Sequence, residues 1–179
     1  SMSFTGQPTV RQFRSEFNIL SVYTASGAFL NDTSLTIDTD TINTVIDAAI
    51  SGDYDAVCWD ENGKNLEMAR SGISDTEIDA ILDALKTIYT ASKARALSSG
   101  RSDLFIGFYD IPGGFANGYY APLQYEQNQN DTNYIINFNE WINWIERLNK
   151  RRSNGSYISV PFSDSCDYIS PSIRPFYGN

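Results

Sequence analysis

Two short segments decide the fold of this chain, AVCWDE (residues 56–61) and LFIGFYDIP (residues 104–112). Each is a run of apolar, β-branched and aromatic residues that stops on a carboxylate and continues into glycine-containing chain. Near-continuous apolar runs of this length are typical of strands covered on both faces, as in parallel sheets. The carboxyl ends of parallel strands meet at one edge, where the following loops build the functional site. We therefore expect Asp60, Glu61 and Asp110 to gather at a common edge.

Strands and helices alternate along the whole chain. The predicted strands are residues 17–23, 54–60, 104–110 and 167–173. Three helices are predicted between them from apolar residues at helical spacing. The first ends at Gly52, and the second begins with a capping box of Ser74 and Glu77. The third begins with a weaker box of Asn137 and Glu140, before an apolar face that includes two tryptophans.

This alternation predicts an α/β fold with a parallel sheet and right-handed crossovers. The chain of 179 residues reads as one domain, with a polar lead-in at residues 1–16 and βα units over residues 17–179. A complete eightfold barrel needs about 250 residues. The expected architecture is therefore either a small open parallel sheet or a half TIM-type barrel. A half barrel would cover its exposed sheet edges by pairing with another copy, which predicts a homo-oligomer.

Composition excludes several classes of function. The net charge of −9 argues against nucleic acid and against an anionic membrane surface as partners. Because the chain has no histidine, acid–base catalysis must use other side chains. Cys58 and Cys166 fall in predicted strands without metal-ligand spacing, and we expect buried thiols and no metal. The glycines do not match the nucleotide-binding motifs, so no cofactor is expected.

The acids at the strand ends suit the cleavage of glycosidic bonds. That reaction needs one carboxyl group that stays protonated near neutral pH and a second that stabilises or attacks the developing cation. Carboxylates crowded beside Trp59 and Tyr109 in a partly desolvated cleft would have at least one raised pKa. The alternative is structural, since acids at strand ends also cap helices and bind loop amides.

Three segments resemble a known family. GFYDIPGGFANGYY (residues 107–120) resembles the end of a central strand in hyaluronidase-like (β/α) barrels and in related uncharacterised glycosidase-like barrels. AVCWDENGKNLEMAR (residues 56–70) is similar to the preceding strand of those proteins, which carries Asp-x-Glu. SPSIRPFY (residues 170–177) resembles their next strand. The three segments occur in the family's order, so the resemblance implies a barrel-type architecture.

The resemblance also implies roles for individual residues. Glu61 matches the family's general acid. The position of the family's aspartate, which holds the substrate's acetamido group, is occupied by Trp59, and Asp60 is displaced from it by one residue. A shift of one residue on a strand reverses the face of the side chain, so Asp110 is the alternative second carboxylate.

The expected contacts with substrate come from the same motifs. These residues are Trp59, Tyr109, Asn117, Arg174 and Tyr177. Arg174 stands where the family has tyrosine, whereas Tyr109 is retained.

Three functions remain open from the sequence. The first is a glycoside-hydrolase-like protein with Glu61, Asp60 and Asp110 as its catalytic residues and a carbohydrate as its partner. The second is a module that binds glycans without cleaving them. The third is a structural homo-oligomer, for instance a viral or secreted assembly component, that retains the barrel strands.

Overall fold

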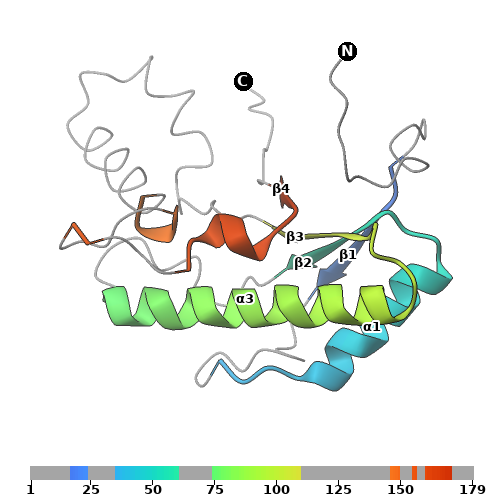
Figure 1. Cartoon of the computed structure of the whole chain (residues 1–179), viewed down its shortest axis with the longest axis horizontal. Helices are drawn as coiled ribbons and strands as arrows, with labels where there is room; N and C mark the ends of the chain where they lie inside the picture. The colour runs from blue at the N-terminus through green and yellow to red at the C-terminus, as the bar shows by residue number, and fades with distance from the viewer. Residues whose placement is uncertain are drawn as a thin grey trace, which may run out of the picture.

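The computed structural model describes residues 17–23, 35–60, 74–109, 146–149, 155–156 and 160–170 of the chain (Figure 1). The elements follow one another in the order β1 (Ile19–Tyr23), α1 (Thr39–Ser51), β2 (Ala56–Asp60), α3 (Asp75–Ser98), β3 (Phe105–Tyr109), η2 (Phe162–Ser165) and β4 (Tyr168–Ser170). Residues 146–149 are also helical. The third predicted helix otherwise lies outside the described residues.

The strands form one parallel sheet in the order β1-β2-β3-β4. The predicted α/β class and the parallel direction are therefore confirmed. The strands begin one or two residues later than the sequence predicted, because residues such as Asp55 and Leu104 belong to the turns that lead into them. The prediction that Cys166 lies in a strand is wrong, since it ends the 3₁₀ turn η2.

Local sequence signals explain where the two described crossover helices begin. The side chain of Asp38 caps α1 by accepting hydrogen bonds from the backbone amides of Asp40 and Thr41 at 3.0 and 3.2 Å. Ser74 and Glu77 form the predicted capping box at the start of α3, with the Ser74 amide donating to Glu77 Oε2 at 2.9 Å. Both caps satisfy amides that have no partner within the helix.

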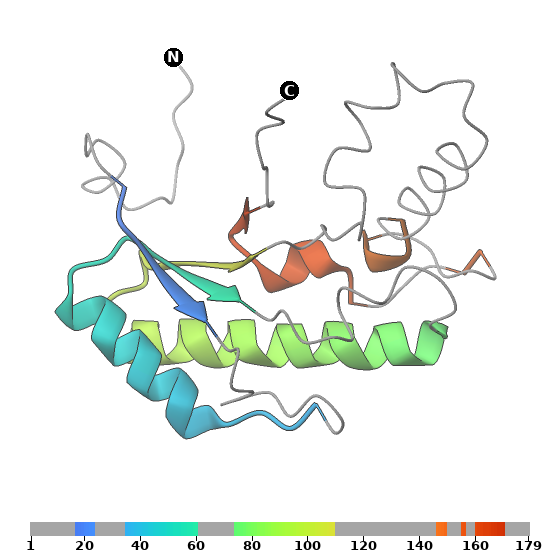
Figure 2. The same ribbon diagram turned by 180° about the vertical axis from the view of Figure 1, so that it is seen from behind.

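Both helices lie on the same face of the sheet, as Figures 1 and 2 show from opposite sides. α1 and α3 are joined by the guanidinium of Arg95, which donates to both carboxylate oxygens of Asp47 at 2.8 and 2.6 Å. The strands send Val57, Trp59, Ile106 and Phe108 toward these helices, and all four side chains are fully buried. We call this side the helix face and the opposite side the second face.

The helix face contains the hydrophobic core. Its largest fully buried side chains on α1 and α3 are Ile42, Ile46, Ile78, Leu82, Leu85 and Ile88. The 24 residues of α3 span about 36 Å, whereas a five-residue strand spans roughly 17 Å. The first turns of α3 therefore extend past the carboxyl ends of the strands. Their apolar side chains are nevertheless buried, and Phe162 of η2 and Leu148 belong to the same core.

A tyrosine crosses three strands on the second face. The ring of Tyr168, on β4, lies over Gly107 of β3, where an added Cβ would approach the ring to 2.5 Å. The hydroxyl continues to β2 and donates to the carbonyl oxygen of Val57 at 3.1 Å. Gly107 is thus required by the close approach of the ring, not by an unusual backbone angle.

We predict that Gly107→Ala destabilises the protein, because the new methyl group displaces the Tyr168 ring and breaks its hydrogen bond to Val57. The expected loss in the free energy of unfolding is about 1–3 kcal/mol, measured by urea titration. In a Tyr168→Ala background the same substitution meets no ring and should cost much less. Equal costs in the two backgrounds would show that the Tyr168 ring does not impose the glycine.

Candidate functional site

The carboxyl ends of the four strands lie along one edge of the sheet. In the parallel register Tyr23 is opposite Asp60, Trp59 is opposite Phe108, and Tyr109 is opposite Ser170. The chain therefore leaves β2 and β3 side by side, and neighbouring strands are about 4.8 Å apart. We call this edge the rim. It is the edge at which the sequence predicted a functional site.

Most of the predicted site residues lie outside the described residues. These are Glu61, Asp110, Asn117, Arg174 and Tyr177. Asp60 is the last residue of β2, and Tyr109 is the last residue of β3 and is half-buried. By sequence, Glu61 and Asp110 directly follow these two adjacent strand ends.

Trp59 is a core residue of the helix face. Its side chain is fully buried, and the indole Nε1–H donates to the hydroxyl of Ser92 on α3 at 3.2 Å. Burial removes the apolar surface of the ring from water, and the Ser92 hydroxyl pairs with the one polar group of the indole. We therefore assign Trp59 to packing and leave it out of the proposed substrate contacts.

The backbone of β2 remains a regular strand up to the rim. Its register with β1 runs without interruption from Ala56 to Asp60. A β-bulge inserts one extra residue, so that the side chains after it change faces of the sheet. No bulge occurs over this range. The one-residue offset between Asp60 and the aspartate of the family motif is therefore not corrected within the strand.

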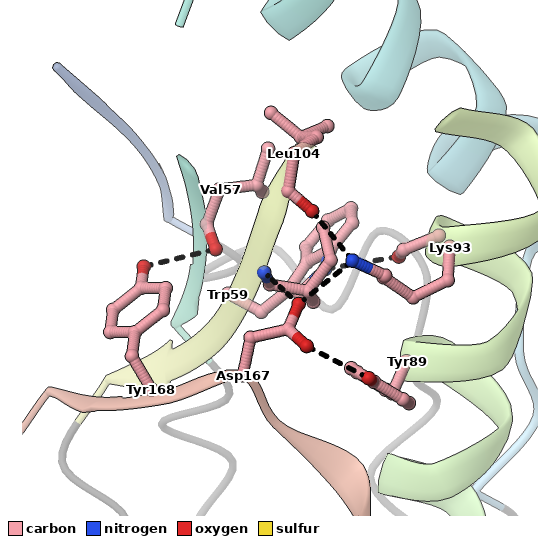
Figure 3. Close-up of polar contacts among 9 residues, drawn as sticks. Val57, Trp59, Tyr89, Lys93, Leu104, Asp167 and Tyr168 are labelled. Carbon is pink, nitrogen blue, oxygen red and sulfur yellow. Dashed lines mark hydrogen bonds and ion pairs between the residues drawn. The ribbon is translucent and has the colours of Figure 1, made fainter. Parts of the chain in front are cut away.

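A second polar cluster lies nearer the amino ends of the strands (Figure 3). The carboxylate of Asp167, just before β4, accepts hydrogen bonds from the Tyr89 hydroxyl at 2.9 Å and from the Ile106 amide at 2.8 Å. Lys93 lies 3.1 Å from the same carboxylate and also donates to the Leu104 carbonyl oxygen at 2.8 Å. The residue as a whole is exposed, yet its side chain is 19% exposed because the carboxylate turns inward.

Sequence reasoning missed this cluster. Tyr89, Lys93 and Asp167 were not among the predicted site residues. The signal available was the spacing of Tyr89 and Lys93, which are four residues apart and thus share one side of the helix. Their acceptor is more than 70 residues away in sequence, so no local pattern identifies it.

The cluster also sets the protonation of nearby groups. Burial, followed by the hydrogen bond and the negative charge of Asp167, raises the pKa of Tyr89 to about 12. Burial likewise raises the pKa of the Cys166 thiol, with a further contribution from Asp167. Burial is also the main cause that raises the pKa of Tyr168, whose neighbour Cys58 adds to the effect. These groups are therefore neutral at physiological pH, which suits a structural cluster.

Among the described residues, no group of three or more Cys, Asp or Glu residues is arranged to hold a metal ion. No helix in the described ranges is both long and apolar enough to cross a membrane.

Comparisons with known proteins found no relative. The chain matches no protein-family model, no curated protein and no solved structure.

We predict that Tyr89→Phe is destabilising at pH 8 and much less so at pH 11. The neutral Tyr89 is favoured by folding, so its contribution is complete below pH 10, where an unfolded tyrosine is also neutral. It is lost as the pH rises toward the folded pKa of about 12. Urea midpoints of the wild type and the variant at both pH values measure the difference. A gap that is equally large at pH 8 and pH 11 would contradict the assignment.

Proposed function

We propose that this protein is a carbohydrate-active protein of glycoside-hydrolase type, with its site at the rim. The observation that carries the proposal is the parallel register of β2 and β3. Because of it, the chain segments that begin with Glu61 and Asp110 start from adjacent strand ends on the same edge of the sheet.

The proposed chemistry divides the work between two carboxyl groups. Glu61 protonates the leaving glycosidic oxygen, and Asp110 stabilises the oxocarbenium-like transition state or attacks the sugar. Asp60 is the alternative to Asp110 in this second role. Tyr109 contacts the substrate at the rim.

Three further residues complete the proposed substrate contacts, namely Asn117, Arg174 and Tyr177. Water is the co-reactant, and the reaction requires no metal or nucleotide.

The strand order supports a barrel-type unit. Doubly wound α/β sheets carry helices on both faces, whereas the units of a (β/α) barrel are joined in sequence with all helices outside. Here the strands follow in sequence order, and α1 and α3 cover the same face. We propose that the four units form half of a barrel of this type, in which the second face is the interior side.

One observation favours a second candidate function, a glycan-binding or assembly module without catalysis. The regular backbone of β2 up to Asp60 leaves the acid pair offset by one residue from the family's arrangement. A site with an unmatched pair retains polar groups that bind sugar hydroxyls but loses the partner that positions the reacting group.

We predict that Glu61→Gln abolishes sugar release. Loss of the general acid lowers the rate by about 10²–10⁴-fold. Aryl glycosides, hyaluronan and oligomers of N-acetylglucosamine serve as probes, with reducing ends and released phenol as the readout. Asp110→Asn is expected to have a comparable effect.

Asp83→Asn is the matched control, because Asp83 is an exposed carboxylate on α3, which lies on the helix face. It should leave turnover unchanged. Turnover that is equal in the wild type and in Glu61→Gln rejects the catalytic proposal. Binding of these glycans by both proteins, without release of sugar by either, selects the binding module instead.

A further inference from the structure

The second face of the sheet is apolar and is most open at β1. Phe17 and Ile19 are 52% and 43% exposed, and Ser21 is exposed as well. Farther along the same face, Ala56 and Cys58 of β2 are buried. Exposure therefore increases from the middle of the sheet toward the β1 edge.

The residues at this edge form one continuous patch. The Phe17 ring lies 5.9 Å from the ring of Phe105 on β3, which connects the start of β1 with the middle of the sheet. Ile19 is in register with Ala56, which is in turn in register with Phe105, so these residues lie in one row across the three strands. We call Phe17, Ile19 and Ser21 the β1 patch. Exposed aromatic and aliphatic side chains grouped in this way are typical of a contact surface.

The backbone of β1 also has a side directed away from β2. The carbonyl oxygen of Asn18 accepts a hydrogen bond from the Ala56 amide, so this residue faces β2. Backbone groups alternate in direction along a strand, which turns those of Ile19 and Ser21 toward the opposite side. Among the described strands β1 pairs with β2 alone, and β4 pairs with β3 alone.

These features indicate that a second copy of the chain binds at the free side of β1. The edge of β4 is the only other sheet edge among the described strands, and it runs parallel to β1. β1, β3 and β4 contain no charged residue, and β2 has one only at its last position, Asp60. A chain of net charge −9 repels its own copies, and strands with a single charged residue among them are where this repulsion is weakest, so the sheet is the surface at which two copies can meet.

We propose that two copies associate with β1 of each along β4 of the other. A two-fold axis along the strand direction keeps all strands parallel and generates both contacts at once, so both edges are paired in one closed ring. The second faces of the two sheets then pack toward each other. The ring has eight parallel strands, the number at which a barrel of this kind closes.

The inference also deepens the proposed function and partly rests on its half-barrel architecture. In the closed ring the rims of the two copies form a single rim, and each copy contributes its own Glu61 and Asp110. A site bounded by one copy alone would lack half of its walls. The dimer is therefore the form in which the proposed site is complete.

The test is the mass of the full chain in solution, measured by light scattering after gel filtration and by sedimentation velocity. We expect twice the chain mass of 20.0 kDa. Ile19→Lys places a charge in the β1 patch, and Ser21→Pro removes an outward amide without touching the ladder to β2. Each should raise the dimer dissociation constant at least about tenfold, that is by about 1.4 kcal/mol or more.

Leu97→Lys is the matched control. Leu97 is a 66% exposed apolar residue near the end of α3, and α3 lies on the helix face, so this substitution should leave the dimer unchanged. Ile19→Lys and Leu97→Lys introduce the same charge at exposed apolar positions. Circular dichroism of the helices confirms that each variant is folded. If Ser21→Pro fails this check, Ile19→Lys decides the result.

Several results would overturn the inference. One is a wild-type chain that stays monomeric at concentrations on the order of 100 µM, where even weak dimers form. Another is a dimer that Ile19→Lys leaves intact. A third is a disulfide between two copies of Ser21→Cys, because the proposed ring holds these positions apart whereas antiparallel β1–β1 pairing brings them together.

Failure of this inference can be told apart from failure of the proposed function. Mass measurements require no sugar, so a dimer that cleaves no glycan supports the ring and rejects catalysis. A monomer that cleaves glycans rejects the ring and supports catalysis. Ile19→Lys tests the dimer and the catalytic function together. If both proposals hold, this variant loses the dimer and releases no sugar.

Discussion

The last strand of the sheet depends on a single carboxylate. Asp167 binds the Ile106 amide with its side chain, and its own amide donates to the Ile106 carbonyl oxygen at 2.7 Å. Through Tyr89 and Lys93 the same carboxylate holds β4 against α3. β4 has only three residues, too few to be stable by its own ladder. The position of β4 at the rim therefore depends on the contacts of Asp167, which lie near the opposite ends of the strands.

Both described helices lie on one face of the sheet, so the two faces differ in composition and packing. The helix face provides the hydrophobic core, and ion pairs such as Arg95 with Asp47 fix the helices to each other. On the second face lie the small residues Ala56, Cys58 and Gly107, the crossing ring of Tyr168, and the exposed side chains of Phe17 and Ile19. The large buried side chains are thus concentrated on one side of the sheet. This division matches the general organisation of parallel α/β proteins.

Local patterns predicted the elements well, because the interactions that define them are local. The capping box of Ser74 and Glu77 and the apolar run of β2 were readable from a few neighbouring residues. The parallel order followed from the alternation of elements. The Asp167 cluster was not predictable, since its members are brought together only by tertiary folding. Trp59 shows the same limit, because an aromatic residue near a strand end has the same local pattern whether it faces a cleft or the core.

The position of Cys58 has a consequence for the reactivity of its thiol. It is 4% exposed on β2, beside the Tyr168 ring, and its burial shields the sulfur from oxidants and alkylating reagents. A reagent reaches this sulfur when the structure around it opens locally. The alkylation rate of Cys58 therefore reports how often the sheet opens locally. Cys166 is more accessible and supplies the reference rate in the same sample.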